Sequence, residues 1–293
     1  MASREKSIRR EYSTVYSQFD SPLIQKIRSE AFEEDIGQHS WIIAKDLREY
    51  LDWLALSPTD QILDFGCGPA GPLTYVVSQT GVKAIGVDIN ATALASAQNR
   101  VSTMGLSERI ALQDVSEETI PPFKDYLFNA VISIDVVMHL PDRTQTFSEL
   151  WRVLAPGGRF LFTDACIVNG ALSDEDIRVR SHYGISHFVP DDFNESALTD
   201  AGFTLEKKQQ HSDGLIAICS GRWKAREKYK KELVTQFGVT EFEHEQTYLK
   251  KLVELYSEKK LLRYAFLARK TSSWSVSDGK DSASEEYENT EVK

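Results

Sequence analysis

A glycine-rich turn directly after a short apolar segment constrains the fold of this chain more than any other feature. The apolar segment covers residues 62–65, and the turn Gly66-Cys67-Gly68-Pro69-Ala70-Gly71 leads from it into a helix-forming stretch at residues 72–79. Glycines allow a tight turn, and because they lack Cβ they let backbone N–H groups approach a ligand at the start of the next helix. The order of strand, glycine turn and helix is typical of nucleotide-binding α/β proteins.

Segments typical of strands and helices alternate along the rest of the chain. Apolar runs predict the further strands 82–87, 109–112, 128–134, 159–163, 203–209 and 263–268, while helical periodicity predicts helices at 91–104, 143–154 and 190–201. Such βαβα order favours a parallel sheet with helices on both faces. We therefore predict a doubly wound, mostly parallel, seven-stranded Rossmann-like α/β sheet.

The remaining helical segments predict covers over this sheet. A helix begins after Ser21-Pro22, a second covers residues 40–56, and charge-rich helices follow at 224–234 and 243–257. We expect five parts in chain order: an N-terminal helical cover (1–40), a cofactor-binding core (41–210), a helical lid (211–260), the last core strand (261–270) and a disordered acidic tail (271–293).

The composition excludes several classes of function. The formal net charge is −10, which disfavours a nucleic-acid substrate because phosphate backbones bind clustered Lys and Arg. No apolar run approaches the ~20 residues that a membrane span needs. The three cysteines are far apart, which argues against disulfides and a zinc site. We expect a cytoplasmic protein that binds no metal, membrane or nucleic acid.

An acidic residue stands at or near the end of each of the first three predicted strands. Asp64 lies two residues before the first glycine, Asp88 ends the second strand and Asp114 follows the third. A carboxylate at position 64 repels a pyrophosphate but attracts an ammonium by roughly 1 to 4 kcal/mol at 4 Å. Asp88 can accept hydrogen bonds from ribose hydroxyls, and Asp114 one from an adenine amino group. The pattern favours a cofactor that carries an amino-acid ammonium group over a dinucleotide.

These motifs resemble those of class I S-adenosylmethionine-dependent methyltransferases. Asp64-Phe65-Gly66-Cys67-Gly68 is similar to their first motif, and residues 154–159, with Pro156-Gly157-Gly158, resemble their turn before the fifth strand. The family's third glycine usually falls at Ala70, so Gly71 is the candidate for that close approach here. The resemblance implies S-adenosyl-L-methionine as cofactor, bound by Asp64, Gly66, Gly68, Gly71, Asp88, Ile89, Asp114, Val115 and Trp41.

Candidate catalytic residues follow the fourth strand. Asp135 and His139 are four positions apart, so on one helical turn they share a face, and a histidine beside a carboxylate is kept basic. This stretch resembles that of phosphoethanolamine methyltransferases, in which the histidine pairs with an N-terminal tyrosine. The resemblance implies His139 as general base, Asp135 as an acceptor-binding group, and Tyr16 as the assisting tyrosine, with Tyr12 as the alternative.

Other segments offer candidate binding residues. The polar stretch at 32–41 resembles one that closes over the methionine part of the cofactor in small-molecule methyltransferases, including glycine and sarcosine enzymes, with Gln38, Ser40 and Trp41 as candidates. In the predicted lid, an anionic group can be recognised through charge-assisted hydrogen bonds by Arg180, His182, Tyr183 and His187. The aromatic residues of the later helices, Trp223, Tyr248 and Tyr256, are interpreted as packing.

The leading hypothesis is an enzyme that methylates a small-molecule acceptor, with an amine or hydroxyl favoured by His139. Two alternatives are a non-enzymatic cofactor-binding or scaffolding protein and an NAD-dependent oxidoreductase, the latter supported only by the GxGxxG spacing. A protein or nucleic-acid methyltransferase is a further option, although the Asn-Pro-Pro-aromatic motif of adenine-amino methylases is absent after the fourth strand.

Overall fold

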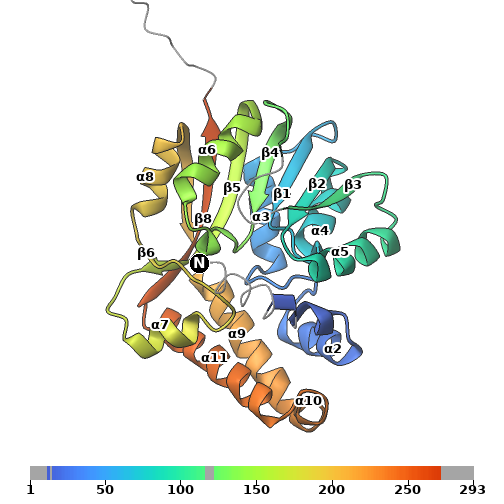
Figure 1. The fold of residues 1–293 in the computed structure, drawn as a ribbon, viewed down its shortest axis with the longest axis vertical. Helices are drawn as coiled ribbons and strands as arrows, with labels where there is room; N and C mark the ends of the chain where they lie inside the picture. The colour runs from blue at the N-terminus through green and yellow to red at the C-terminus, as the bar shows by residue number, and fades with distance from the viewer. Residues whose placement is uncertain (1–11, 14, 116–121, 272–293) are drawn as a thin grey trace, which may run out of the picture.

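The computed structural model describes residues 12–13, 15–115 and 122–271. In this part of the chain a single sheet runs in the order β3-β2-β1-β4-β5-β8-β7, with the short strand β6 beside β5 (Figure 1). The strands are β1 (Gln61–Phe65), β2 (Lys83–Asp88), β3 (Ile110–Asp114), β4 (Phe128–Ser133), β5 (Leu154–Val168), β6 (Val189–Pro190), β7 (Phe203–Gln210) and β8 (Leu261–Lys270).

The sheet is mostly parallel, as the alternation of segments predicted. Strands β1 to β5 pair in parallel with their neighbours, and only β8 runs antiparallel, between β5 and β7. The predicted Rossmann-like class is therefore confirmed. Two details differ: the two-residue β6 is an additional strand, and β5 extends to Val168 because its second half also pairs with β8 and β6.

Helices cover both faces of this sheet. One apolar layer packs residues of α3, α4 and α5 against it, including Leu47, Leu73 and Val101, and the opposite layer packs Phe147 of α6 and Leu198 of α8. Each layer combines buried strand residues with the apolar stripe of its helices. The helices are α3 (Ala44–Leu54), α4 (Gly71–Thr80), α5 (Ala91–Thr103), α6 (Arg143–Val153) and α8 (Phe193–Asp200).

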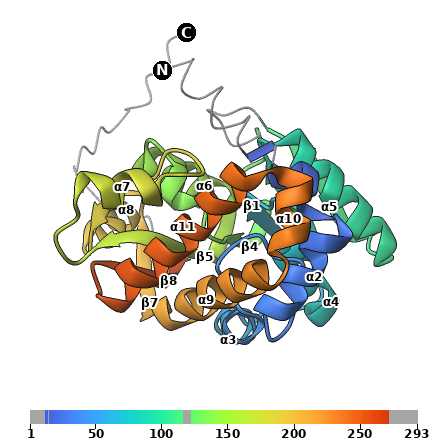
Figure 2. The same cartoon turned by 90° about the horizontal axis from the view of Figure 1, so that it is seen from below.

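Further helices of the described residues gather beyond the carboxyl ends of the parallel strands (Figures 1 and 2). In Figure 2 the helices α9 and α11 lie across this end of the sheet, and they share an apolar cluster that includes Leu215, Leu249 and Leu252. This helical layer closes the edge of the sheet at which parallel α/β proteins bind ligands. It consists of α2 (Pro22–Ala31), α7 (Asp174–Arg180), α9 (Ser212–Lys228), α10 (Lys230–Phe237) and α11 (Val239–Ser257).

Several predicted boundaries shift. The insertion before β8 forms three helices instead of two, and Gly238, with φ +90°, separates the last two. The helix predicted at 40–56 begins only at Ala44, because the backbone N–H of Trp41 is bound by Asp135 and the N-cap residue Ile43 is extended. The predicted tail lies beyond the described residues, apart from residue 271. No helix in the described ranges is long and apolar enough to cross a membrane.

Candidate functional site

The glycine turn lies against the end of β2. Gly66 and Gly68 have φ values of +81° and +52°, which residues with a side chain rarely adopt. The Asp88 carboxylate accepts hydrogen bonds from the backbone N–H groups of Gly68 and Asn90, both at 2.8 Å. Asp88 thereby joins the turn after β1 to the loop after β2, and Asn90 in turn caps α5.

The three acids predicted at strand ends lie at the same edge of the sheet. Asp88 and Asp114 are paired in register on β2 and β3, and Asp64 lies on the adjacent strand β1. Asp64 is only 3% exposed, and burial, with the nearby charge of Asp88, raises its pKa to about 8. Asp114 is exposed, as is Ile89, whereas Val115 is buried. Of these three carboxyl groups, the ionised form of Asp64 would therefore gain most from a bound cation.

Two of the candidate cofactor glycines are in contact with protein. A Cβ on Gly66 would lie 2.4 Å from Val136, and one on Gly71 would lie 2.2 Å from the carbonyl oxygen of Gly37. The interpretation of Gly71 as the residue that lets a ligand approach is therefore corrected. Its missing Cβ makes room for the backbone of the segment before α3.

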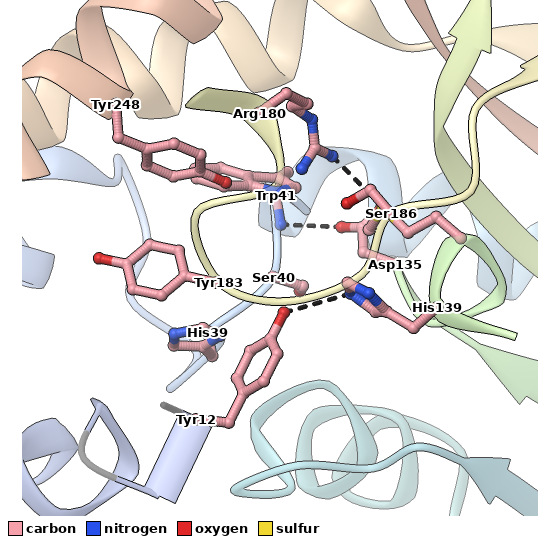
Figure 3. Close-up of a pocket in the computed structure, with 11 residues that line it drawn as sticks. Tyr12, His39, Ser40, Trp41, Asp135, His139, Arg180, Tyr183, Ser186 and Tyr248 are labelled. Carbon is pink, nitrogen blue, oxygen red and sulfur yellow. Dashed lines mark hydrogen bonds between the residues drawn. The ribbon is translucent and has the colours of Figure 1, made fainter. Parts of the chain in front are cut away.

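Tyr12, and not Tyr16, is the tyrosine that reaches His139. The Tyr12 hydroxyl lies 3.2 Å from His139 Nε2 (Figure 3). Tyr16 stacks on Tyr12 with ring centroids 5.9 Å apart, and its hydroxyl lies 3.4 Å from the position of a Cβ on Gly68. The assignment of Tyr16 to the pair is thus corrected in favour of the alternative, since one further helical turn places Tyr16 over the glycine turn.

His139 is oriented by a backbone carbonyl. Its Nδ1 lies 2.7 Å from the carbonyl oxygen of Ile185, which can only accept, so Nδ1 carries the proton and Nε2 is free to accept from Tyr12. Burial lowers the pKa of His139 to about 4, so the ring is neutral at pH 7. The expectation that Asp135 orients this ring and keeps it basic is therefore wrong.

Asp135 has other partners. It has φ +56° and lies outside the short 3₁₀ helix η1 (Val137–His139), so the two side chains do not share a helical face. Its carboxylate accepts from the backbone N–H of Trp41 at 2.8 Å, from Thr163 Oγ1 at 2.8 Å and from Arg263 Nε at 3.0 Å. Burial would raise its pKa, but the charge and hydrogen bonds of Arg263 hold the pKa below its usual value.

These residues surround a pocket with about 50 Å³ of free volume next to the helical layer (Figure 3). Its lining combines aromatic, polar and charged side chains from the N-terminal segment, the region before α3, the end of β4, the segment around α7, and α11. The lining residues are Tyr12, His39, Ser40, Trp41, Asp135, Met138, His139, Arg180, Tyr183, Ser186 and Tyr248.

Arg180 is a buried cation in the wall of this pocket. It is 3% exposed, its guanidinium lies 3.3 Å from Met138 Sδ, and its Nε has no hydrogen-bond partner. Among the residues that the structure describes, no carboxylate lies within the 4.0 Å of an ion pair with it. A buried charge without a counterion is costly, so an anionic group in the pocket would be strongly favoured here.

Two other lid residues that were predicted to bind the acceptor, Tyr183 and His187, differ in their positions. Tyr183 lines the pocket, whereas His187 is not among the lining residues. The His187 backbone N–H binds the Met138 carbonyl and its carbonyl accepts from Arg143, and acceptor binding by its side chain stays a prediction. Tyr248, interpreted as packing, is also part of the pocket wall. Met138 and Ser186, which line the pocket, and Arg263, which binds Asp135, were not predicted as site residues; for Arg263 a single sequence offers no signal.

The fold and this edge together have the arrangement expected of a Rossmann-like domain of the class I methyltransferase type. The comparisons bear this out. Residues 63–162 match a family model described as a methyltransferase domain, and the predicted resemblance is confirmed over this part of the chain.

The chain is similar to phosphoethanolamine N-methyltransferase 1 of Zea mays, at 24% identity over 200 residues, which are 68% of this chain and 39% of that protein. It is 31% identical to a sterol 24-C-methyltransferase of Gibberella zeae over 199 residues, covering 66% of this chain and 49% of the relative. The chain thus spans less than half the length of these curated relatives.

Solved structures show the same fold. Phosphoethanolamine N-methyltransferase 2 of Haemonchus contortus, in complex with S-adenosyl-L-methionine, superposes with a TM-score of 0.71 at 21% identity, covering 87% of this chain and 59% of that one. The [4+2]-cyclase SpnF superposes with a TM-score of 0.70 at 18% identity, covering 89% and 97%. Because a cyclase shares the fold, the fold alone does not determine the reaction.

Proposed function

We propose that this chain is an S-adenosylmethionine-dependent methyltransferase that transfers a methyl group to a small-molecule acceptor. The main observation behind the proposal is that the glycine turn at the cofactor edge and the acceptor pocket lie next to each other. Val136, next to Asp135, packs on Gly66 of the glycine turn, and Tyr12 stacks on Tyr16 above Gly68. The acceptor pocket therefore lies beside the edge that carries Asp64.

The residues at this edge suit the cofactor. Bound S-adenosylmethionine supplies an activated methyl group on a positively charged sulfur. Asp64 is buried and in need of a cation, which fits the ammonium of its methionine part. Asp88 and Asp114 stand where ribose and adenine groups are bound in doubly wound folds. The match of residues 63–162 to a methyltransferase domain supports the same assignment.

The Tyr12–His139 pair favours an acceptor that loses a proton, namely an amine or a hydroxyl. The methyl group would come from bound S-adenosylmethionine, and the Tyr12–His139 pair would take the proton that the acceptor atom gives up. A neutral imidazole with its proton on Nδ1 can accept this proton at Nε2. Thioether acceptors have no such proton, so for them the pair would have no function.

Arg180 supports an acceptor that also carries an anionic group. Its guanidinium lies in the pocket wall without a carboxylate partner among the described residues, and Tyr183 and Tyr248 line the same pocket (Figure 3). An anion there would gain charge-assisted hydrogen bonds in a site shielded from water. We further propose that α9 to α11 act as the lid of this pocket, and that the described residues before position 41 cover the cofactor; residues 1–11 of the predicted N-terminal cover lie outside the described part of the chain.

Titration calorimetry tests the cofactor, with S-adenosylhomocysteine and NADH as ligands. We expect micromolar or tighter binding of the first and none of the second. The reverse result would establish the oxidoreductase alternative, and binding of neither would refute the proposal.

Methyl transfer is tested separately, with isotopically labelled cofactor, cell extract and mass spectrometry, against the His139→Ala variant as control. Cofactor binding without any labelled product would favour the scaffold alternative or a different reaction on the same fold.

A further inference from the structure

The segment between α7 and β6, residues 181–188, has neither helix nor strand but contributes several groups to the pocket. Tyr183 and Ser186 line the cavity, and the Ile185 carbonyl receives the Nδ1–H of His139. The tautomer of His139 therefore depends on where this segment lies. What holds the segment in place then decides whether the histidine presents Nε2 to the pocket.

The two ends of the segment are attached to the core in different ways. At its carboxyl end, the His187 backbone binds the Met138 carbonyl at 2.8 Å and Arg143 at 3.0 Å. In its middle, Gly184 has φ +122°, a conformation that only glycine adopts readily and that gives the chain a flexible joint. Ile185 therefore needs a second attachment on the other side of this joint.

That attachment is Tyr183. Its hydroxyl points away from the centre of the pocket (Figure 3) and donates a hydrogen bond to Glu245 on α11. Its ring meets Tyr248, one helical turn further along α11, with centroids 5.1 Å apart and planes at 89°. His182 of the same segment also contacts α11, with its ring centroid 5.7 Å from that of Tyr248 and 6.0 Å from that of His244. Among these contacts, the hydrogen bond from Tyr183 to Glu245 is the one that a single hydroxyl supplies.

Glu245 stands in surroundings that strengthen this contact. Loss of water around the carboxyl raises its pKa to about 8. A hydrogen bond to a poorly solvated carboxyl is worth more than one on the surface, because water competes less for the acceptor. No part of the methyl-transfer chemistry described above uses Glu245.

We propose that Glu245 is a positioning residue of this site: by accepting the Tyr183 hydroxyl it holds residues 181–188 against α11, and so keeps the Ile185 carbonyl on His139. The inference rests on the proposed base role of His139 for its functional meaning. Glu245 itself touches neither the acceptor nor the histidine.

The tautomer of His139 provides the test, by ¹⁵N NMR of the histidine rings in the full chain, with His139→Ala to identify its signals. We expect the wild-type ring to be protonated on Nδ1. In Glu245→Ala and in Tyr183→Phe, the ratio of Nδ1–H to Nε2–H should fall about fivefold or more, the factor for one lost hydrogen bond of ordinary strength. Glu245→Gln keeps an acceptor oxygen and should retain most of the wild-type ratio.

Glu243→Ala is the matched control, since this glutamate lies on the same helix with an exposed side chain. Amide exchange across residues 181–188 should speed up about tenfold in the two disrupting variants and stay unchanged in the control. A wild-type ratio in both Glu245→Ala and Tyr183→Phe, or a wild-type ring protonated on Nε2, would overturn the inference. Tyr183→Phe removes a single hydroxyl, so it tests the contact even if Glu245→Ala fails to fold.

None of these measurements needs methyl transfer. Failure of the inference therefore leaves the proposed function intact. Conversely, a chain that did not bind S-adenosylhomocysteine could still show the coupling between Glu245 and His139.

Discussion

Replacing Asp64 by asparagine should weaken cofactor binding while making the unliganded protein more stable. Asp64 is 3% exposed and its pKa is raised to about 8 by burial and by Asp88. Its attraction to an ammonium at 4 Å is roughly 1 to 4 kcal/mol for effective dielectric constants of 80 to 20. We therefore expect Asp64→Asn to bind S-adenosylhomocysteine roughly 5-fold to 1,000-fold more weakly at pH 8.5.

The pH dependence of cofactor binding provides a second test of the role of Asp64. In the unliganded protein the Asp64 carboxyl is protonated below about pH 8, and the bound ammonium requires it to be ionised. Binding to the wild type should therefore release a proton, and affinity should rise by up to about tenfold per pH unit until pH 8 and then level off. In Asp64→Asn this dependence should vanish, so the two proteins differ most at alkaline pH.

The stability effect has the opposite sign. With a pKa above its unfolded value, the folded Asp64 holds a proton that the unfolded chain has lost, so stability falls as pH rises from about 4 to 8. At about 1.4 kcal/mol per unit, the free energy of unfolding loses on the order of 4 kcal/mol by pH 7. Asparagine carries no such penalty, so Asp64→Asn should melt at a higher temperature than the wild type at pH 7 and at a similar one at pH 4.

Calorimetry in two buffers of different ionisation enthalpy measures affinity and proton release together, and thermal melts at several pH values measure stability. Asp52→Asn serves as control, because Asp52 is exposed on α3 and away from the site. If Asp64→Asn bound as tightly as the wild type at pH 8.5, or wild-type affinity did not change between pH 6 and 8, the role assigned to this carboxyl would be refuted.

Other substitutions test the remaining parts of the site. His139→Ala should lower kcat by about 10²–10⁴ without changing the affinity for S-adenosylhomocysteine. Because the pKa of His139 is about 4, the kcat of the wild type should stay level down to about pH 5. A fall in wild-type kcat near pH 7 would contradict this. Tyr12→Phe should lower kcat less, by about tenfold, with unchanged KM for the cofactor; an effect confined to KM would exclude its place beside His139. Arg180→Met should raise KM for an anionic acceptor at least about tenfold, whereas equal KM values would show that no anion binds there. Gly71→Ala should cost about 1–3 kcal/mol in urea unfolding because its Cβ meets the Gly37 carbonyl, and wild-type stability would disprove that contact.

The cofactor edge could be predicted from sequence because parallel sheets have a simple geometry. Once residues 61–65 and 83–88 are recognised as parallel neighbours, the residues at their carboxyl ends must lie at the same edge. Asp64 and Asp88 needed only this rule to be placed together. The alternation of apolar segments sufficed in the same way for the order and direction of the core strands.

The environment of His139 could not be predicted by such a rule. The spacing of four residues from Asp135 suggested a shared helical face, but Asp135 adopts φ +56° and only residues 137–139 form a helical turn. Its carboxylate is instead engaged by Arg263, which is 128 positions away in the chain. A periodicity argument describes regular elements, and this histidine lies where the regular element ends.

The same reasoning explains why the contacts within the acceptor pocket could not be predicted, although several of its lining residues, such as His139 and Arg180, were candidates from the sequence. Tyr12, Trp41, His139 and Tyr183 belong to segments that are far apart in the chain, and they meet because the helical layer folds back over the sheet (Figure 3). No sequence pattern within any one of these segments indicates that their side chains come into contact. The cofactor edge is built by repeated strand–helix units, so its residues can be predicted from sequence. The acceptor pocket is closed by loops and an inserted helical layer, and its composition depends on contacts that only the folded chain provides. Variation in the acceptor is therefore expected to arise in residues 181–188 and α11, where substitutions leave the cofactor edge untouched.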